Sequence, residues 1–344
     1  MPELSFLDLV RIRQDDASPR DALERAADLA QYAEQLGFRR YWVAEHHNMR
    51  GIGSAATSIV IAHIAEATST IRIGSGGIML PNHSPLLIAE QFGTLAALYG
   101  DRIDLGLGRA PGTDGYASRA LRRDPQAADR FPQDVLELQA LLGDPVPDQA
   151  VIATPGAGTH VPIWILGSSL FGARLAAELG LPFGFASHFA PQGLDAALNV
   201  YRTYFKPSEQ LAAPYALIGV IVVAADTDAE AKRLATTAQM ASTNILRDAR
   251  TLSLPPIDNI DDYWTPQEKP HVLERMTCSA IGSPETVRER LAAIAERTQA
   301  DEFMIVSDIY DHEARKHSLG LTVAATKNYV TPSEVEGREK ILAL

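Results

Sequence analysis

The sequence has little cysteine and fewer basic than acidic residues, and each shortage excludes a class of protein. Cysteine occurs once in 344 residues, at Cys278, so the chain can form no internal disulfide and no zinc site built on several cysteines. Lysine and arginine number 31 against 43 aspartate and glutamate residues, for a net charge of −12. This balance argues against nucleic acid or an anionic membrane as the main partner.

Long apolar runs are also lacking. No stretch approaches the roughly 18 apolar residues that a membrane-spanning helix needs. The N-terminal segment carries charges at Glu3, Asp8 and Arg11, which does not fit the apolar part of a secretory signal. We therefore expect a cytoplasmic protein with no membrane segment.

Short apolar segments alternate with helical patterns along most of the chain. Eight segments read as strands: residues 4–12, 41–44, 71–80, 103–107, 162–166, 183–187, 215–224 and 302–307. Eight strand-then-helix units favour an α/β fold of the closed (β/α)8 TIM-barrel type, and an open doubly wound sheet fits less well. We expect one barrel domain over residues 1–330, followed by a C-terminal extension at residues 331–344.

Two irregular segments interrupt the alternation. One, residues 143–161, precedes the fifth strand, and the other, residues 248–281, precedes the eighth. Long insertions in a compact domain are often functional lids. Because Tyr263 and Trp264 give the second insertion apolar anchors, we predict that it forms a lid or substrate-binding region.

Polar residues collect where the strands end, which is where TIM barrels carry their chemistry. Glu45, His46, His47 and Asn48 directly follow the second strand. Adjacent residues of a strand point to opposite faces, so one imidazole should face the barrel mouth as a candidate proton donor or acceptor. The other should be structural, held by Glu45 or Asn48, and a structural role for both histidines stays open. His188 is a second imidazole at a strand end.

The third predicted strand contains two adjacent glycines, Gly76 and Gly77. Glycine inside a strand often marks a bulge or the close approach of a ligand, and a loosely packed bend is the alternative. The neighbouring Ile78 would suit the face of a flat aromatic ring.

Two segments are candidates for holding phosphate. Gly167, Ser168 and Ser169 lie between a strand and a helix, where backbone N–H groups can bind an anion or where a serine can simply cap the helix. Arg109 follows another strand among glycines and could bind the same anion.

Together these segments resemble the bacterial-luciferase-like superfamily of flavin-dependent oxidoreductases. The resemblance rests on residues 43–48, 71–91, 101–114, 165–182 and 280–287, in the family's order. It implies reduced FMN as the cofactor, with its ring over the third strand and its phosphate on Ser168 and Ser169 near Arg109. The family's non-proline cis peptide would fall at Gly76–Gly77, and His46 matches the family's catalytic histidine.

The resemblance also implies partners: O2, a small organic substrate, and a second copy of the chain in a homodimer formed through the helices after strands two and three. No G-x-G-x-x-G follows the first strand, so we expect reduced FMN to come from a separate NAD(P)H:flavin reductase in a two-component monooxygenase. His188, Tyr263 and Trp264 are the candidate substrate contacts, and no metal is expected.

Three other functions remain open. A reduced deazaflavin could replace FMN and transfer hydride without oxygen. A metal-dependent barrel hydrolase could use His46, His188 and a carboxylate from Glu45 or Asp308. The barrel could also bind flavin without catalysing a reaction.

Overall fold

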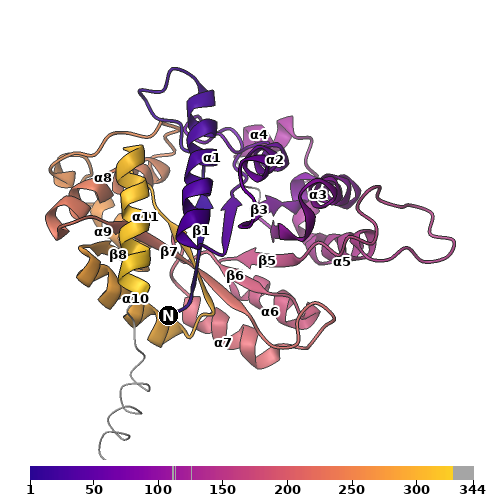
Figure 1. Ribbon diagram of the computed structural model, residues 1–344. Helices are drawn as coiled ribbons and strands as arrows, with labels where there is room; N and C mark the ends of the chain where they lie inside the picture. The colour runs from indigo at the N-terminus through magenta and orange to yellow at the C-terminus, as the bar shows by residue number, and fades with distance from the viewer. Residues whose placement is uncertain (111, 113, 125, 328–344) are drawn as a thin grey trace, which may run out of the picture.

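Eight parallel strands close into a barrel in the computed structural model of the chain (Figure 1). They are β1 (Glu3–Asp8), β2 (Arg40–Val43), β3 (Arg72–Met79), β4 (Ile103–Gly108), β5 (Ile163–Gly167), β6 (Phe183–Phe185), β7 (Ala216–Ala224) and β9 (Glu302–Val306). The barrel closes where β9 pairs with both β7 and β1. The predicted (β/α)8 TIM barrel is therefore confirmed. The structure describes residues 1–110, 112, 114–124 and 126–327, and the expected extension at residues 331–344 lies outside them.

Helices surround the barrel (Figure 1). They are α1 (Pro19–Leu36), α2 (Thr57–Ala67), α3 (Pro85–Tyr99), α4 (Gly115–Ala120), α5 (Phe131–Leu142), α6 (Leu170–Leu179), α7 (Leu194–Tyr204), α8 (Asp228–Leu246), α9 (Glu268–Arg275), α10 (Pro284–Thr298) and α11 (His312–Lys327). The first shows how sequence sets their ends: Ser18 and Asp21 form a capping box, and Gly37 ends the helix at φ 84°. None of the described helices is both long and apolar enough to cross a membrane.

The strands bury both faces. Side chains such as Tyr41 and Phe303 point outward and pack with the helices in the main core. Their neighbours in sequence, including Trp42 and Met304, point inward and pack inside the barrel. This alternation is the period of two that any strand imposes on its side chains.

The second insertion contains more regular structure than the sequence indicates. It holds α9 and leads into a ninth strand, β8 (Ser279–Gly282), which pairs with the C-terminal half of β7 beyond the point where β9 pairs with it. This strand has one large apolar side chain, Ile281, so the sequence shows no apolar run there. Near the start of the insertion, Ser253 forms a bridge with Arg13 of the loop after β1. Whether the insertion acts as a lid stays a prediction.

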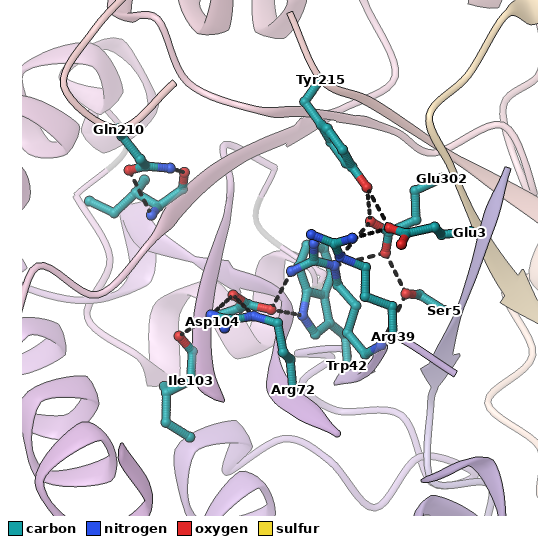
Figure 2. A network of polar contacts seen from close by, with 12 residues as sticks. Glu3, Ser5, Arg39, Trp42, Arg72, Ile103, Asp104, Gln210, Tyr215 and Glu302 are labelled. Carbon is teal, nitrogen blue, oxygen red and sulfur yellow. Dashed lines mark hydrogen bonds and ion pairs between the residues drawn. The ribbon is translucent and has the colours of Figure 1, made fainter. Parts of the chain in front are cut away.

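An ion network fills the N-terminal end of the barrel (Figure 2). Arg40 donates to Glu302 and to Asp104, each at 2.7 Å, and Arg72 also binds Asp104. Ser5 and Tyr215 donate hydrogen bonds to Glu302, and the indole N–H of Trp42 donates to Asp104 at 3.2 Å. This floor network closes one end of the barrel, so ligands must enter from the other.

Candidate active site

His46 lies at the barrel mouth. β2 pairs with β3 with Val43 beside Ser75, and His46 continues the inward series of Trp42 and Ala44. Its Nδ1 atom is buried and has no hydrogen-bond partner among the described residues. Burial, followed by the nearby charge of Arg11, lowers the pKa of His46 to about 4. At neutral pH this imidazole is uncharged and can accept a proton or donate one to a bound molecule.

His47 has the structural role expected for one histidine of the pair. Its Nε2 lies 2.8 Å from Oε1 of Glu45, and Nε2 of His83 lies 3.0 Å from the same carboxylate. The N–H of Met79 also donates to Glu45 at 3.0 Å. Burial alone would raise the pKa of Glu45, but the hydrogen bonds from His47 and His83 lower it to about 2. Glu45 therefore ties the end of β2 to the end of β3.

The ligand set required by the metal-hydrolase alternative does not form. Across the described ranges, one group of three ligand atoms lies within 4.8 Å, and it consists of Glu45, His47 and His83. Glu45 bonds these two histidines rather than His46. Asp308 forms an ion pair with Arg11 at 2.8 Å. Among the described residues, His46 and His188 do not form such a group with Glu45 or Asp308, so the structure does not favour the metal-hydrolase alternative.

His188 is placed by strand β7. Its ring packs against the backbone at Gly219, and the preceding Ser187 donates a hydrogen bond to the Gly219 carbonyl at 2.7 Å. Nδ1 of His188 is buried, without a hydrogen-bond partner in the part of the chain that the structure describes. Burial, with a smaller contribution from His46, lowers the pKa of His188 to about 4. The mouth therefore holds two neutral imidazoles.

The peptide bond between Gly76 and Gly77 is cis, as the family resemblance predicted. A Cβ atom on Gly76 would lie 2.6 Å from Leu7, and one on Gly77 would lie 2.6 Å from the Gly106 carbonyl. The register of β3 with β4 shifts at this point. Ile78 is buried in the core between strands and helices, and its contact with a bound ring stays a prediction.

The segment after β5 has the features expected of an anion site. Ser168 and Ser169 are exposed, and the side chain of Ser169, the N-cap residue, makes no capping hydrogen bond to α6 within the described structure. The Arg109 guanidinium lies 4.0 Å from the ring centroid of Phe171, in the first turn of α6. The structure thus brings Arg109 to the positive end of this helix, beside Gly167, Ser168 and Ser169.

Tyr263 and Trp264 contact the helices of the insertion. The Tyr263 hydroxyl donates to Asn244 of α8 at 2.8 Å. Trp264 is buried in a cluster with Ile221, Val272 and Met276. Their assignment to the substrate pocket stays a prediction, and the contacts that the structure gives them are those of an anchor for the insertion.

Sequence reasoning missed Arg11 and Gly219. Arg11 gives the mouth a positive charge, and its Nε is buried without a hydrogen-bond partner in the described ranges. Gly219 admits the ring of His188 because it has no side chain. A glycine inside the apolar strand was a usable signal of close approach, whereas an arginine beyond the end of a strand carries no distinctive pattern.

Comparison with known proteins identifies the family. The model of the luciferase-like monooxygenase family matches residues 3–302. A luciferase-like monooxygenase of Escherichia coli (strain K12) is 49% identical over 320 residues, covering 93% of this chain and 95% of the relative. N-acetyl-S-alkylcysteine monooxygenase of Bacillus subtilis (strain 168) is 31% identical over 317 residues, covering 90% and 93%.

Solved structures agree with this result. The crystal structure of apo-MsnO8 superposes with a TM-score of 0.84 at 33% identity, covering 96% of this chain and 100% of that one. Two structures share the fold at lower identity. The FMN complex of the oxygenating constituent of 3,6-diketocamphane monooxygenase from Pseudomonas putida has a TM-score of 0.69 at 18% identity, covering 96% and 99%. An F420-dependent secondary alcohol dehydrogenase has a TM-score of 0.66 at 16% identity, covering 94% and 98%. The barrel, its mouth and these matches lead to one conclusion: the chain belongs to the luciferase-like monooxygenase family of flavin-dependent oxidoreductases.

Proposed function

We propose that this protein is the oxygenase of a two-component, FMN-dependent monooxygenase of the cytoplasm. A separate NAD(P)H:flavin reductase would supply reduced FMN, and O2 and a small organic molecule would be the substrates. The observation that carries the proposal is the state of His46, which follows β2, the strand that pairs with β3. Its imidazole is neutral, and its buried Nδ1 has no hydrogen-bond partner in the described structure.

The residues around the mouth fit FMN. The N–H groups at the start of α6, the hydroxyls of Ser168 and Ser169, and the guanidinium of Arg109 would hold the phosphate. Gly76 and Gly77 have no side chains to obstruct a flat ring beside β3. When bound, reduced FMN supplies the electrons that activate O2, which no side chain of this chain can provide.

The protein's own contribution would be proton handling and the exclusion of water. His46 is uncharged at neutral pH, so Nδ1 can hold or move a proton next to the reacting atoms. The start of the insertion, which is tied to the loop after β1 by the bridge between Ser253 and Arg13, would cover the mouth. Excluding water from such a site strengthens its hydrogen bonds and suppresses wasteful side reactions.

A second copy of the chain would cover an apolar surface on α2 and α3. Ile59 of α2 is 71% exposed, and Leu98 of α3 is 66% exposed. Exposed apolar side chains on neighbouring helices are typical of an interface. Light scattering should give the mass of a dimer for the native protein, and a lower mass for the double variant Ile59→Glu/Leu98→Glu. A native monomer would contradict the homodimer.

Anaerobic titration tests the cofactor. We expect reduced FMN to bind and to give substrate-dependent O2 uptake on aeration. Because a carboxylate at the start of α6 would repel the phosphate, Ser169→Asp should weaken FMN binding at least tenfold and leave riboflavin binding, the internal control, unchanged.

Three outcomes would overturn the proposal. Binding of a reduced deazaflavin alone, with no O2 uptake, would favour hydride transfer. Equal loss of FMN and riboflavin in Ser169→Asp would contradict the phosphate site. Unchanged turnover in His46→Ala, compared with the exposed control His63→Ala, would favour a protein that binds flavin without using His46.

A further inference from the structure

A small cavity lies inside the barrel, between the floor network and the mouth. Its volume is about 50 Å³, and its wall includes Trp42, Gly76, Gly184, His188, Leu217 and Met304. Trp42 connects the cavity to the floor network through its hydrogen bond with Asp104. Gly76 connects it to the mouth, because this residue begins the cis peptide at the proposed flavin site.

The wall is mostly apolar, and its polar side chains are Trp42 and His188. The Trp42 N–H is bonded to Asp104. Nδ1 of His188 lies against the backbone of Gly219, where an added Cβ would be 2.2 Å away. No charged side chain of the described residues lines the cavity. A wall with so few hydrogen-bonding groups binds water poorly and favours small apolar molecules, such as the xenon that enters apolar cavities of other proteins.

The size of the cavity restricts its ligand. Pockets that bind cofactors and drug-sized molecules enclose roughly 300 to 1,000 Å³, so about 50 Å³ cannot hold a tricyclic ring. It can hold a small apolar molecule. Among the reactants of a flavin monooxygenase, dioxygen is the small, uncharged and apolar one.

We propose that this cavity is a dioxygen-binding pocket that stores O2 on the barrel side of Gly76, next to the cofactor. The inference rests on the proposed function for its purpose, since only an oxygen-using enzyme needs such a pocket. Its physical basis is independent of the cofactor, because the cavity exists in the protein alone. A Cβ atom on each of the wall glycines Gly76, Gly184 and Gly219 would lie 2.2–2.6 Å from another side chain of the wall. A larger residue at these positions would therefore push that side chain into the cavity.

Two methionines provide a matched pair for the test. Met304 lines the cavity and is 3% exposed, while Met240 of α8 is 2% exposed and is absent from the cavity wall. Dissolved O2 is paramagnetic and speeds the relaxation of nearby methyl groups. In protein labelled with 13C at the methionine methyls and kept under O2 pressure, relaxation should rise several-fold more for Met304 than for Met240.

Two variants change the cavity in opposite directions. A Cβ at Gly184 would lie 2.6 Å from the Leu166 side chain, so Gly184→Ala should reduce the volume and the O2 effect on Met304. Leu217→Ala shortens a wall side chain and should increase both the cavity volume and the O2 effect on Met304. Gly115→Ala is the control, since no described atom lies within 4 Å of the added methyl group.

The reaction with oxygen gives the functional readout. With reduced FMN bound, stopped-flow mixing with O2 should show a several-fold lower second-order rate constant in Gly184→Ala, with the Kd for FMN unchanged. Equal O2 effects on Met304 and Met240 would overturn the pocket. If O2 speeds relaxation at Met304 but neither Gly184→Ala nor Leu217→Ala changes the rate constant for the reaction with O2, the cavity has no role in supplying O2 to the flavin. Loss of the Met304 effect when oxidised FMN is added would show that the flavin itself fills the cavity.

The two proposals fail in different ways. If the protein binds no flavin, the proposed function fails while the Met304 measurement still reports on the cavity. If flavin binds and turnover is normal but Met304 resembles Met240, only the dioxygen pocket fails.

Discussion

The imidazole of His188 occupies the space that a side chain at residue 219 would need. A Cβ atom on Gly219 would lie 2.2 Å from Nδ1 of His188 and 3.1 Å from Cγ. Contacts this short require one of the two groups to move. The position of His188 at the mouth therefore depends on a glycine in a different strand.

Gly219→Ala should displace His188 and destabilise the protein by about 1–3 kcal/mol. The double variant Gly219→Ala/His188→Ala should recover part of that loss, because the clash disappears with the ring. Urea unfolding of the two single variants and the double variant measures the coupling. Gly115→Ala, which adds a methyl group with no described atom within 4 Å, is the control. Strictly additive effects would contradict the contact.

Acid should destabilise the fold through the two buried imidazoles. The pKa values of His46 and His188 are lowered to about 4, whereas a histidine of the unfolded chain titrates near about 6.5. As the pH falls below about 6.5, the unfolded chain takes up protons that the folded protein does not bind. The free energy of unfolding therefore decreases until the pH reaches about 4.

Replacing one of these histidines should reduce that pH dependence. We expect the free energy of unfolding of His188→Gln to fall less steeply between pH of about 6.5 and 4 than that of the native protein. Urea unfolding at several pH values measures the slope, and the exposed His63→Gln serves as the control. If His188→Gln leaves the pH dependence of the free energy of unfolding unchanged, His188 takes up its proton as readily in the folded protein as in the unfolded chain.

Arg40→Met should destabilise the protein by about 3–5 kcal/mol, because it removes the nearest cation from the buried Glu302 and one of the two arginines that bind the buried Asp104. Arg40 is 3% exposed and binds both Asp104 and Glu302. Arg20→Met, which breaks an exposed ion pair with Glu24, should have a much smaller effect on stability, because solvent screens a surface pair. Equal effects of the two substitutions in chemical denaturation would mean that the floor network adds nothing beyond a surface pair.

Trp264→Ala should destabilise the protein by about 3–5 kcal/mol, since it empties a buried site. Tyr263→Phe removes only the hydrogen bond to Asn244 and should cost about 0.5–1.5 kcal/mol. If both residues act as anchors, Tyr263→Phe should leave the KM for the organic substrate unchanged. A raised KM with unaltered stability would instead place Tyr263 in the substrate pocket.

Much of the fold was predictable because its signals are local. Each barrel strand shows as a short apolar run between glycines or capping residues, and helix α1 is marked at both ends by Ser18 and Gly37. The ninth strand, β8, escaped prediction because its four residues contain one large apolar side chain, Ile281, and so form no apolar run.

The candidate site was also predictable only in part. The family resemblance predicted the cis peptide at Gly76–Gly77. The alternation of side chains along a strand predicted that His46 and His47 point to opposite faces. Alternation could not say which one faces inward. That choice followed from the contacts of Glu45 with His83, which lies 38 residues further along the chain.

The sequence by itself determined the eight repeating units, the glycine pair and the serine pair before α6, because each depends on a few neighbouring residues. Only the tertiary structure decided that Arg40 meets Glu302, 262 residues away, that Arg11 pairs with Asp308, and that His188 rests on Gly219. The physical reason is barrel closure. The stagger between paired strands sets which inward side chains share a level, and no short window of sequence contains that stagger.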